Sequence, residues 1–305
     1  MDSFKTSIGF SKIHKITVAN YELQTKKRSP FVQEQNGKDS YYAVCPECDN
    51  PIQIVGLYKE TRESGRKPYG RHHKGDVPYL AKYSEEDYLE CPFSNPKWEK
   101  TPGKRSPNSP IANRILCAVK DQFDRVIYLL KRQTGIRIGE NLAREMLKTY
   151  VKNEGWLFKE ATLNNIPWIF GQCNPAISLF GRVIKKDSEI YKAIKEKCPE
   201  VVFLPVDESK EYLQIKNKNG QFITLYFTFL NHQKIIENNE RVRETMDFMV
   251  FKEINSNENE TEIIFLETLP IESEYFANLA LSKKYEDKRN QDLLNLAEQV
   301  IGSCL

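Results

Sequence analysis

The stretch Val44-Cys45-Pro46-Glu47-Cys48, followed by Tyr69-Gly70-Arg71-His72-His73 and then Cys91-Pro92, decides how the N-terminal third folds. Two cysteines separated by two residues form a tight turn whose thiolates point toward one centre. A histidine and a third cysteine downstream complete the Cys₃His set of ligands that tetrahedral zinc prefers. The sequence therefore predicts one Zn²⁺ held by Cys45, Cys48 and Cys91, with either His72 or His73 as the fourth ligand.

Such a site is expected to be structural. Four protein ligands leave no open position for water, so the ion would stabilise the fold and would not act as a Lewis acid. The module that contains it, residues 38–100, is too small to form a stable core without such help. A redox role for Cys45 and Cys48 would require a thioredoxin-like βαβ setting, which the flanking sequence lacks.

The same residues support an alternative, a metal-dependent nuclease of the HNH type. In such enzymes a CxxC turn precedes a histidine pair, in which one histidine binds a catalytic ion and the other activates water. Here His72-His73 would be that pair. Against this reading, Ser94 stands where a second cysteine turn would need a cysteine, and Pro92 and Pro96 prevent the usual helix.

Length and composition indicate a globular protein of two or three domains. The chain has 305 residues, of which 40% are hydrophobic and 29% are charged. No apolar run approaches the 18 or so residues of a membrane span, and residues 1–5 lack the apolar stretch of a secretory signal. Seven cysteines in a chain without such a signal fit a reducing compartment, so we expect a cytoplasmic protein without membrane contact.

Charge is divided unevenly along the chain. Residues 111–199 hold 16 basic and 9 acidic side chains, whereas residues 200–282 hold 7 basic and 15 acidic ones. The two segments could attract each other. Alternatively, the basic segment meets a polyanion while the acidic segment faces elsewhere.

Hydrophobic periodicity predicts an α+β protein with four parts: an N-terminal arm or short hairpin (1–37), a zinc-ribbon-like module (38–100), a basic helical domain (101–199), and an antiparallel sheet with C-terminal helices (200–305). The proline-rich residues 92–110 are expected to be a linker or extended strap. Helices are expected at 111–135, 140–153, 174–184, 188–197, 273–281 and 289–301, with 167–170 as core packing between them. Strands are expected at 201–206, 211–217, 221–230, 245–254 and 262–269.

Two local patterns in the C-terminal part lead to specific expectations. Asn219-Gly220 is typical of a type I′ turn and predicts a hairpin between the second and third of these strands. His232 follows Asn231 at a strand end and is expected at the surface. A pocket in which two or more carboxylates and a histidine converge, away from the zinc ligands, would favour an enzyme.

One basic loop is a candidate for nucleic-acid binding. Its cations are Lys59, Arg62, Arg66, Lys67, Arg71 and Lys74. Tyr58 and Tyr69 are interleaved with them, so phosphates could meet cations while unpaired bases stack on the aromatic rings. The alternative is a solvated loop held in place by the zinc ion.

The motifs taken together resemble a set of uncharacterised bacterial proteins often found on mobile elements. The resemblance covers roughly residues 38–275 and is carried by residues 44–52, 56–59, 69–72, 91–92, 122–126, 165–168 and 179–181. It implies a bacterial origin and an intracellular location, and it favours His72 over His73 as the zinc ligand. It implies no activity.

The sequence therefore favours a zinc-stabilised, cytoplasmic, non-catalytic binding protein, in a mobile-element or defence context, with nucleic acid as its partner. An HNH-like nuclease and a protein-binding scaffold remain the alternatives.

Overall fold

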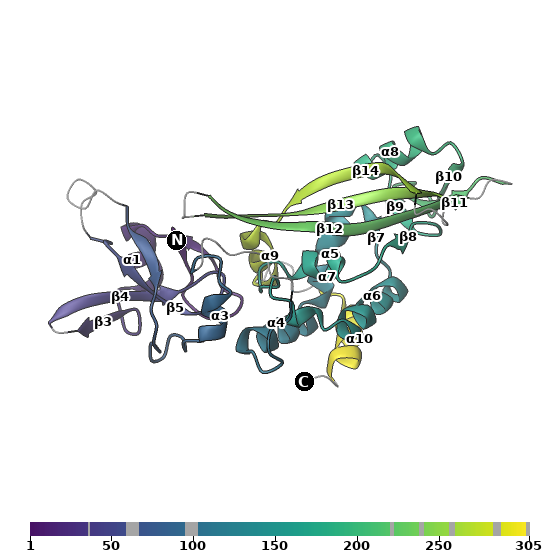
Figure 1. Cartoon of the computed structure of the whole chain (residues 1–305). Coiled ribbons are helices and arrows are strands. Elements are labelled where there is room, and N and C mark those ends of the chain that lie inside the picture. Colours follow the sequence, from purple (N-terminus) through teal and green to yellow (C-terminus); the bar gives the residue numbers. More distant parts are fainter. Residues whose placement is uncertain are drawn as a thin grey trace.

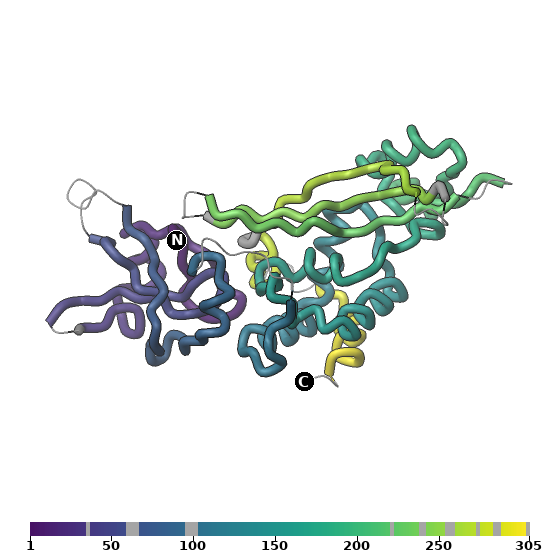
Figure 2. The backbone as a smooth tube through the Cα atoms, viewed as in Figure 1, coloured from purple at the N-terminus to yellow at the C-terminus, as the bar shows by residue number. Residues whose placement is uncertain are grey.

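The computed structural model describes residues 1–35, 37–58, 67–94, 103–219, 223–237, 241–255, 260–282 and 288–302. Two lobes are visible in Figure 1: a smaller N-terminal lobe, residues 1–94, and a larger body, residues 103–302. The tube in Figure 2 shows that a long hairpin of the body reaches toward the N-terminal lobe. Helices combined with antiparallel sheets confirm the predicted α+β class.

The N-terminal lobe is built on an antiparallel sheet with the strand order β3-β4-β5-β6. Its strands are β3 (Val32–Gln35), β4 (Lys38–Val44), β5 (Pro51–Val55) and β6 (Tyr69–His72). The pair β1 (Ser3–Phe4) and β2 (His14–Lys15) and the helices α1 (Val18–Thr25) and α3 (Glu85–Leu89) complete the described part of this lobe.

Residues 1–35 belong to the core of this lobe rather than forming a free arm. Phe4 and Tyr21 are fully buried and cluster with Ile52 and Cys45. Strand β3 pairs with β4 across the boundary expected at residues 37 and 38, with Val32 opposite Tyr41. The division of the chain into four domains stays a prediction.

The described helices of the body are α4 (Pro110–Asp121), α5 (Phe123–Thr134), α6 (Glu140–Lys152), the 3₁₀ helix η1 (Gly155–Leu157), α7 (Ile166–Gln172), α8 (Glu189–Lys197), α9 (Ser273–Ala280) and α10 (Gln291–Ile301). Ser109 caps α4 by accepting a hydrogen bond from the backbone of Ala112, and Pro110 fills the first turn, as the sequence predicts. Of the expected linker 92–110, residues 95–102 lie outside the described part of the chain.

Two helix predictions are wrong. The single helix expected over 111–135 is two helices, because Gln122 leaves the helical region with φ −122° and ψ 20°. The helix expected over 174–184 is replaced by two short strands, β8 (Ile177–Ser178) and β9 (Val183–Lys185). Tertiary pairing outweighs local propensity there, since β8 pairs with β12 (Thr224–Glu237) and β9 pairs with β11 (Tyr212–Asn217) and β7 (Ile136–Arg137).

The body contains two four-stranded antiparallel sheets. The smaller has the order β10-β11-β9-β7, with β10 at Val201–Pro205, and the larger has the order β14-β13-β12-β8, with β13 at Arg241–Asn255 and β14 at Glu260–Pro270. Gly220 lies outside the described residues, but the strand pairing expected across Asn219-Gly220 is wrong: β11 pairs with β10 and β9, whereas β12 pairs with β13 and β8. Strand β12 extends beyond the predicted residue 230 to Glu237, after an irregularity at Leu230–Gln233.

One hydrophobic cluster joins the helices and both sheets of the body. Its fully buried members include Ile115 of α4, Phe170 of α7 and Ile215 of β11. Residues on both sides of the expected boundary at 199 and 200 share this core. In Figure 1 helices α5 and α7 lie beneath the long strands β12 to β14.

The contact between α7 and β12 leaves no room for a side chain at Gly171. A Cβ atom there would lie 2.8 Å from the ring of Phe229. We expect Gly171→Ala to lower the free energy of unfolding, measured by urea denaturation, by about 1–3 kcal/mol, because a core contact becomes overpacked. In a Phe229→Leu background the same change should cost less, and equal costs in both backgrounds would contradict this account of the contact.

Candidate metal centre

Four side chains of the N-terminal lobe converge from separate elements. Cys45 follows the last residue of β4, Cys48 lies in the turn before β5, His72 ends β6, and Cys91 follows α3. The turn between the first two cysteines is held by the backbone, because Cys45 donates to the carbonyl of Asn50 at 2.8 Å. Pairing of β5 with β6 places His72 opposite Ile52 and hence beside the turn.

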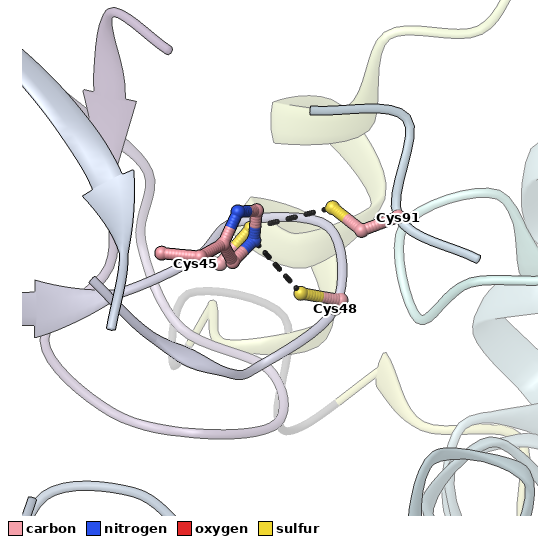
Figure 3. Close-up of side chains that lie close together, drawn as sticks. Cys45, Cys48 and Cys91 are labelled. Carbon is pink, nitrogen blue, oxygen red and sulfur yellow. Dashed lines mark hydrogen bonds between the residues drawn. The ribbon is translucent and has the colours of Figure 1, made fainter. Parts of the chain in front are cut away.

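The convergence has the size of a metal site. One ligand atom from each of Cys45, Cys48, His72 and Cys91 lies within 4.8 Å of all the others. The sulfurs of Cys45 and Cys91 are 3.8 Å apart, and the sulfur of Cys48 is 3.3 Å from Nε2 of His72 (Figure 3). A tetrahedral ion with metal–sulfur distances of about 2.3 Å separates two sulfurs by about 3.8 Å. The arrangement can therefore hold one metal ion, and its donors are consistent with Zn²⁺.

Cys45, Cys48 and Cys91 are buried, and burial acts on the pKa values of their thiols. Burial raises the pKa of the thiols of Cys48 and Cys91 well above the ordinary value. Burial also acts to raise the pKa of Cys45, but hydrogen bonds from the other two thiols and the nearby His72 outweigh it and lower that pKa. The amide of Asn50 donates to the sulfur of Cys48 at 3.4 Å and so stabilises the thiolate form.

His73 and Ser94, the two residues discussed for the HNH-like alternative, make contacts of their own outside the four-residue group. The ring of His73 packs edge-on against Tyr42, with centroids 5.3 Å apart, and is not part of the four-residue group. The hydroxyl of Ser94 donates to the carbonyl of Cys91 at 2.9 Å. Within the part of the chain that the structure describes, no other group of three or more His, Cys, Asp or Glu residues brings its ligand atoms this close together.

The basic loop proposed from the sequence is described only in part. Lys59, Arg62 and Arg66 lie outside the described residues. Arg71 donates to the side chain of Gln53 at 2.9 Å, and the ammonium of Lys74 lies 4.7 Å from the ring centre of Tyr88. Lys67 is exposed. A nucleic-acid role for this loop stays a prediction.

Four acidic residues, Glu47, Asp49, Asp87 and Glu90, lie near the candidate metal ligands in the sequence, and we call them the acidic docking face. Each of these residues lies within four positions of Cys48 or Cys91, and all four are buried or nearly so. The body supplies cations to three of them: Lys234 lies 3.3 Å from Glu47, Arg114 lies 3.2 Å from Asp49, and Glu90 contacts Arg105 at 2.8 Å and Lys159 at 3.5 Å. Asp49 is also paired with the buried Lys5 of its own lobe. The two lobes therefore meet through opposite charges beside the metal site.

The ion pairs between the two lobes involve part of the basic segment of the chain. Arg114 and Lys159 belong to the basic segment 111–199, and their carboxylate partners lie in the N-terminal lobe. A hydrogen bond supports the ion pairs, since the side-chain amide of Asn164 donates to the backbone carbonyl of Pro46, inside the cysteine turn, at 3.0 Å. Burial raises the pKa of Asp87 to about 6.

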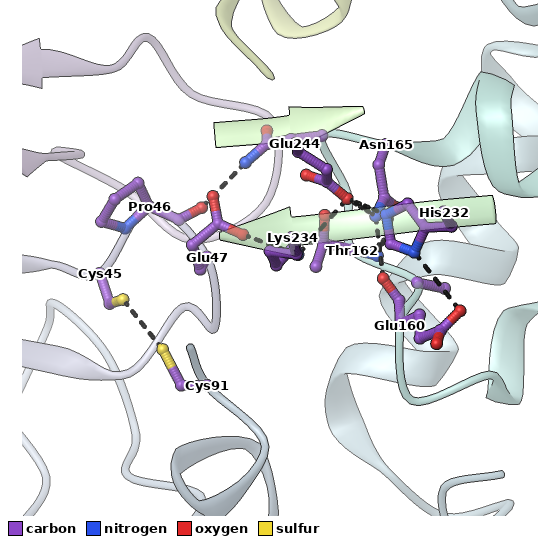
Figure 4. A network of polar contacts seen from close by, with 12 residues as sticks. Cys45, Pro46, Glu47, Cys91, Glu160, Thr162, Asn165, His232, Lys234 and Glu244 are labelled. Atoms are coloured by element: carbon purple, nitrogen blue, oxygen red, sulfur yellow. Dashed lines mark hydrogen bonds and ion pairs between the residues drawn. The ribbon is translucent and has the colours of Figure 1, made fainter. Parts of the chain in front are cut away.

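The ion pair of Glu47 continues into a buried network of the body (Figure 4). Lys234 of β12 lies 3.3 Å from Glu47 and 3.5 Å from Glu244 of β13, and all three side chains are at most 5% exposed. Glu244 also accepts a hydrogen bond from Asn165 at 2.6 Å. The network thus links the cysteine turn, the loop before α7 and the β12–β13 hairpin.

His232 closes this network and is buried, so the surface position expected from the sequence is wrong. Its Nε2 lies 2.5 Å from Glu244 and its Nδ1 lies 3.4 Å from Glu160. Only an imidazolium can donate from both ring nitrogens, so this geometry favours the charged form. The burial has a non-local cause, because Glu160 lies 72 residues away in the sequence.

The pKa values in this network follow from burial and charge together. Burial alone would lower the pKa of His232 and of Lys234, but their carboxylate partners outweigh it and raise both. Burial acts to raise the pKa of Glu244, but Lys234 and His232 outweigh it and lower that pKa. His232, Lys234 and Glu244 are therefore held in their charged forms, whereas burial outweighs Lys234 at Glu47 and raises the pKa of that carboxyl.

Glu160, Glu244 and His232 thus form the convergence of two carboxylates and a histidine that would favour an enzyme. Both ring nitrogens of His232, however, contact a carboxylate. A cleft of about 580 Å³ lies beside them, where the N-terminal lobe meets the hairpin, and its lining includes Glu47 and Glu244 but not His232. His232 is thus poorly placed to activate water, and its two carboxylate contacts join the β12–β13 hairpin to the segment before α7 within the body.

No protein-family model, curated protein or solved structure matches this chain. The bacterial and mobile-element resemblance stays a prediction. Among the described residues no helix is long and apolar enough to cross a membrane.

Removing the cation of Lys234 should destabilise the protein strongly. Lys234→Met keeps the aliphatic stem but leaves Glu47 and Glu244 buried without their shared partner, which costs roughly 3–5 kcal/mol of unfolding free energy. Urea denaturation measures the loss. The matched control is Lys252→Met, whose partner Glu200 is more accessible to water, with a cost of about 1 kcal/mol or less. Equal costs for the two variants would contradict a special role for Lys234.

The stabilisation by His232 should depend on pH. The pKa of His232 is raised in the folded state, so its contribution is complete below the ordinary value of 6.5 and is lost as the pH rises through the folded-state pKa. The difference in unfolding free energy between the wild type and His232→Gln should therefore shrink as the pH rises above the ordinary value of 6.5. A difference that grows with pH would contradict the ion-pair assignment to Glu160 and Glu244.

Proposed function

We propose that Cys45, Cys48, His72 and Cys91 bind one structural Zn²⁺. The observation that carries this proposal is the closed set of four ligand atoms, all within 4.8 Å of one another, with sulfur spacing suited to a tetrahedral ion. A bound Zn²⁺ would supply folding free energy to a lobe whose buried hydrophobic cluster is small and includes three of these ligands.

The ion would also hold the acidic docking face in place. Glu47 and Asp49 flank Cys48 directly, and Glu90 directly precedes Cys91, so fixing the thiolates fixes the backbone that carries these carboxylates. Their partners Lys234, Arg114 and Arg105 belong to the body. On this proposal the metal centre has a mechanical role, which is to keep the two lobes joined.

We further propose nucleic acid as the partner of the assembled protein. The support is the surplus of positive charge in residues 111–199, 16 basic against 9 acidic side chains, of which the N-terminal lobe uses only Arg114 and Lys159 in the ion pairs described above. A protein-binding scaffold is the competing function. An HNH-like nuclease would have to rely on His73, because His72 is a member of the metal-ligand group.

The zinc assignment predicts about one equivalent of zinc per chain in purified protein, measured by mass spectrometry of the metal, because a closed Cys₃His site takes one ion. Cys48→Ser and His72→Ala should lose the zinc, since each removes one of four ligands. The matched control is His73→Ala, which removes a neighbouring imidazole outside the group and should retain zinc. Zinc that survives in His72→Ala and disappears in His73→Ala would overturn the ligand set.

A further inference from the structure

The smaller sheet of the body has one buried and one accessible face. Ile136, Ile184 and Ile215 point into the core and are fully buried. The alternate residues of the same strands lie on the opposite face and are partly or fully exposed. We call this surface the β11 face; it comprises Arg137, Val183, Lys185, Tyr212, Gln214 and Lys216, together with Lys131 of α5, whose ammonium lies over the Tyr212 ring.

An aromatic ring surrounded by cations lies on the β11 face. Tyr212 of β11 is directly opposite Lys185 of β9 in the ladder. The ammonium of Lys131, from the last turn of α5, lies 5.0 Å from the centre of the Tyr212 ring, and the guanidinium of Arg137 lies 5.9 Å from it. Three cations from three elements thus gather around one tyrosine.

The charge of this surface is largely uncompensated. In the described part of the chain no carboxylate forms an ion pair with Lys131, Arg137 or Lys216. Lys185 has one partner, Glu211, at 3.9 Å, and both side chains are more than half exposed. A contact of that length in water contributes little, so a polyanion can compete for Lys185.

We propose that the β11 face binds single-stranded nucleic acid; this rests on the proposed function and names its surface and substrate class. Phosphates would contact Lys131, Arg137 and Lys185, whose flexible stems allow small movements. An unpaired base would stack on Tyr212 as the ammonium of Lys131 moves from the ring to a phosphate. A duplex keeps its bases stacked on each other and can offer this face only its phosphates, so single strands are preferred.

The test uses the full-length, zinc-loaded chain and a fluorescein-labelled 20-nucleotide oligothymidylate, with binding followed by fluorescence anisotropy at several salt concentrations. The triple variant Lys131→Ala, Arg137→Ala, Lys185→Ala should bind at least tenfold more weakly at low salt. Its salt dependence should be shallower by up to about 2 log units per tenfold change in salt, which corresponds to three lost phosphate contacts. Tyr212→Leu should weaken binding about tenfold with an unchanged salt dependence, because it removes stacking and no charge.

The matched control is Arg144→Ala, Lys148→Ala, Lys152→Ala, which removes the same charge from helix α6. It should change the affinity less than about threefold. Zinc content and circular dichroism establish that every variant is folded. An unlabelled duplex of the same length serves as competitor and should compete more weakly than the single strand.

Three outcomes overturn an assignment. If the chain binds the single strand but the β11 triple variant and the α6 control behave alike, the β11 face is wrong while nucleic acid stands as the partner. If the duplex competes better than the single strand, the substrate class is wrong. If the chain binds neither at low salt, nucleic acid as the partner fails together with this inference, and the scaffold function replaces it.

Discussion

The positive charge of Lys234 lies almost completely out of water, and the joining of the two lobes depends on how that charge is balanced. Glu47, from the cysteine turn, and Glu244, from the β12–β13 hairpin, flank its ammonium at 3.3 and 3.5 Å. A buried charge that loses its partner is far more costly than a surface one, so neither carboxylate can move away without a large penalty. Glu47 is positioned by its neighbours Cys45 and Cys48, which ties this balance to the metal site.

Opposite charges also pair at other points of the contact between the lobes. The N-terminal lobe presents carboxylates and the body presents cations, so the modest net charge of +3 conceals two strongly complementary surfaces. Within the body, His232 and Asn165 contact Glu244 and hold it beside Lys234. Charged networks of this kind fix one relative arrangement of two units more precisely than apolar contact does, because each partner must be satisfied in position.

Local patterns predicted what depends on local interactions. The cysteine spacing predicted the cluster of Cys45, Cys48 and Cys91 that the structure brings together with His72. Helical periodicity identified helices such as α6, expected at 140–153 and found at Glu140–Lys152. The predictions fail where contacts between residues far apart in the sequence determine the local structure. Residues 177–178 and 183–185 form strands because β12 and β11 offer pairing partners. The strands before and after Asn219-Gly220 do not pair with each other, because β12 pairs with β13 and β8. His232 is buried because Glu160 and Glu244 meet it, and no pattern around Asn231-His232 reveals those partners.

On the proposed function, the metal ion holds the acidic docking face against the body. Hydrogen–deuterium exchange of the full chain, compared between zinc-loaded and chelator-treated protein, tests it most directly. We predict that zinc removal speeds exchange in the N-terminal lobe and also in residues 232–237, 241–246 and 159–165, while α4 to α6 stay protected. If the N-terminal lobe loses protection and the β12–β13 hairpin exchanges as before, the joining of the lobes does not depend on the metal, and the account is wrong.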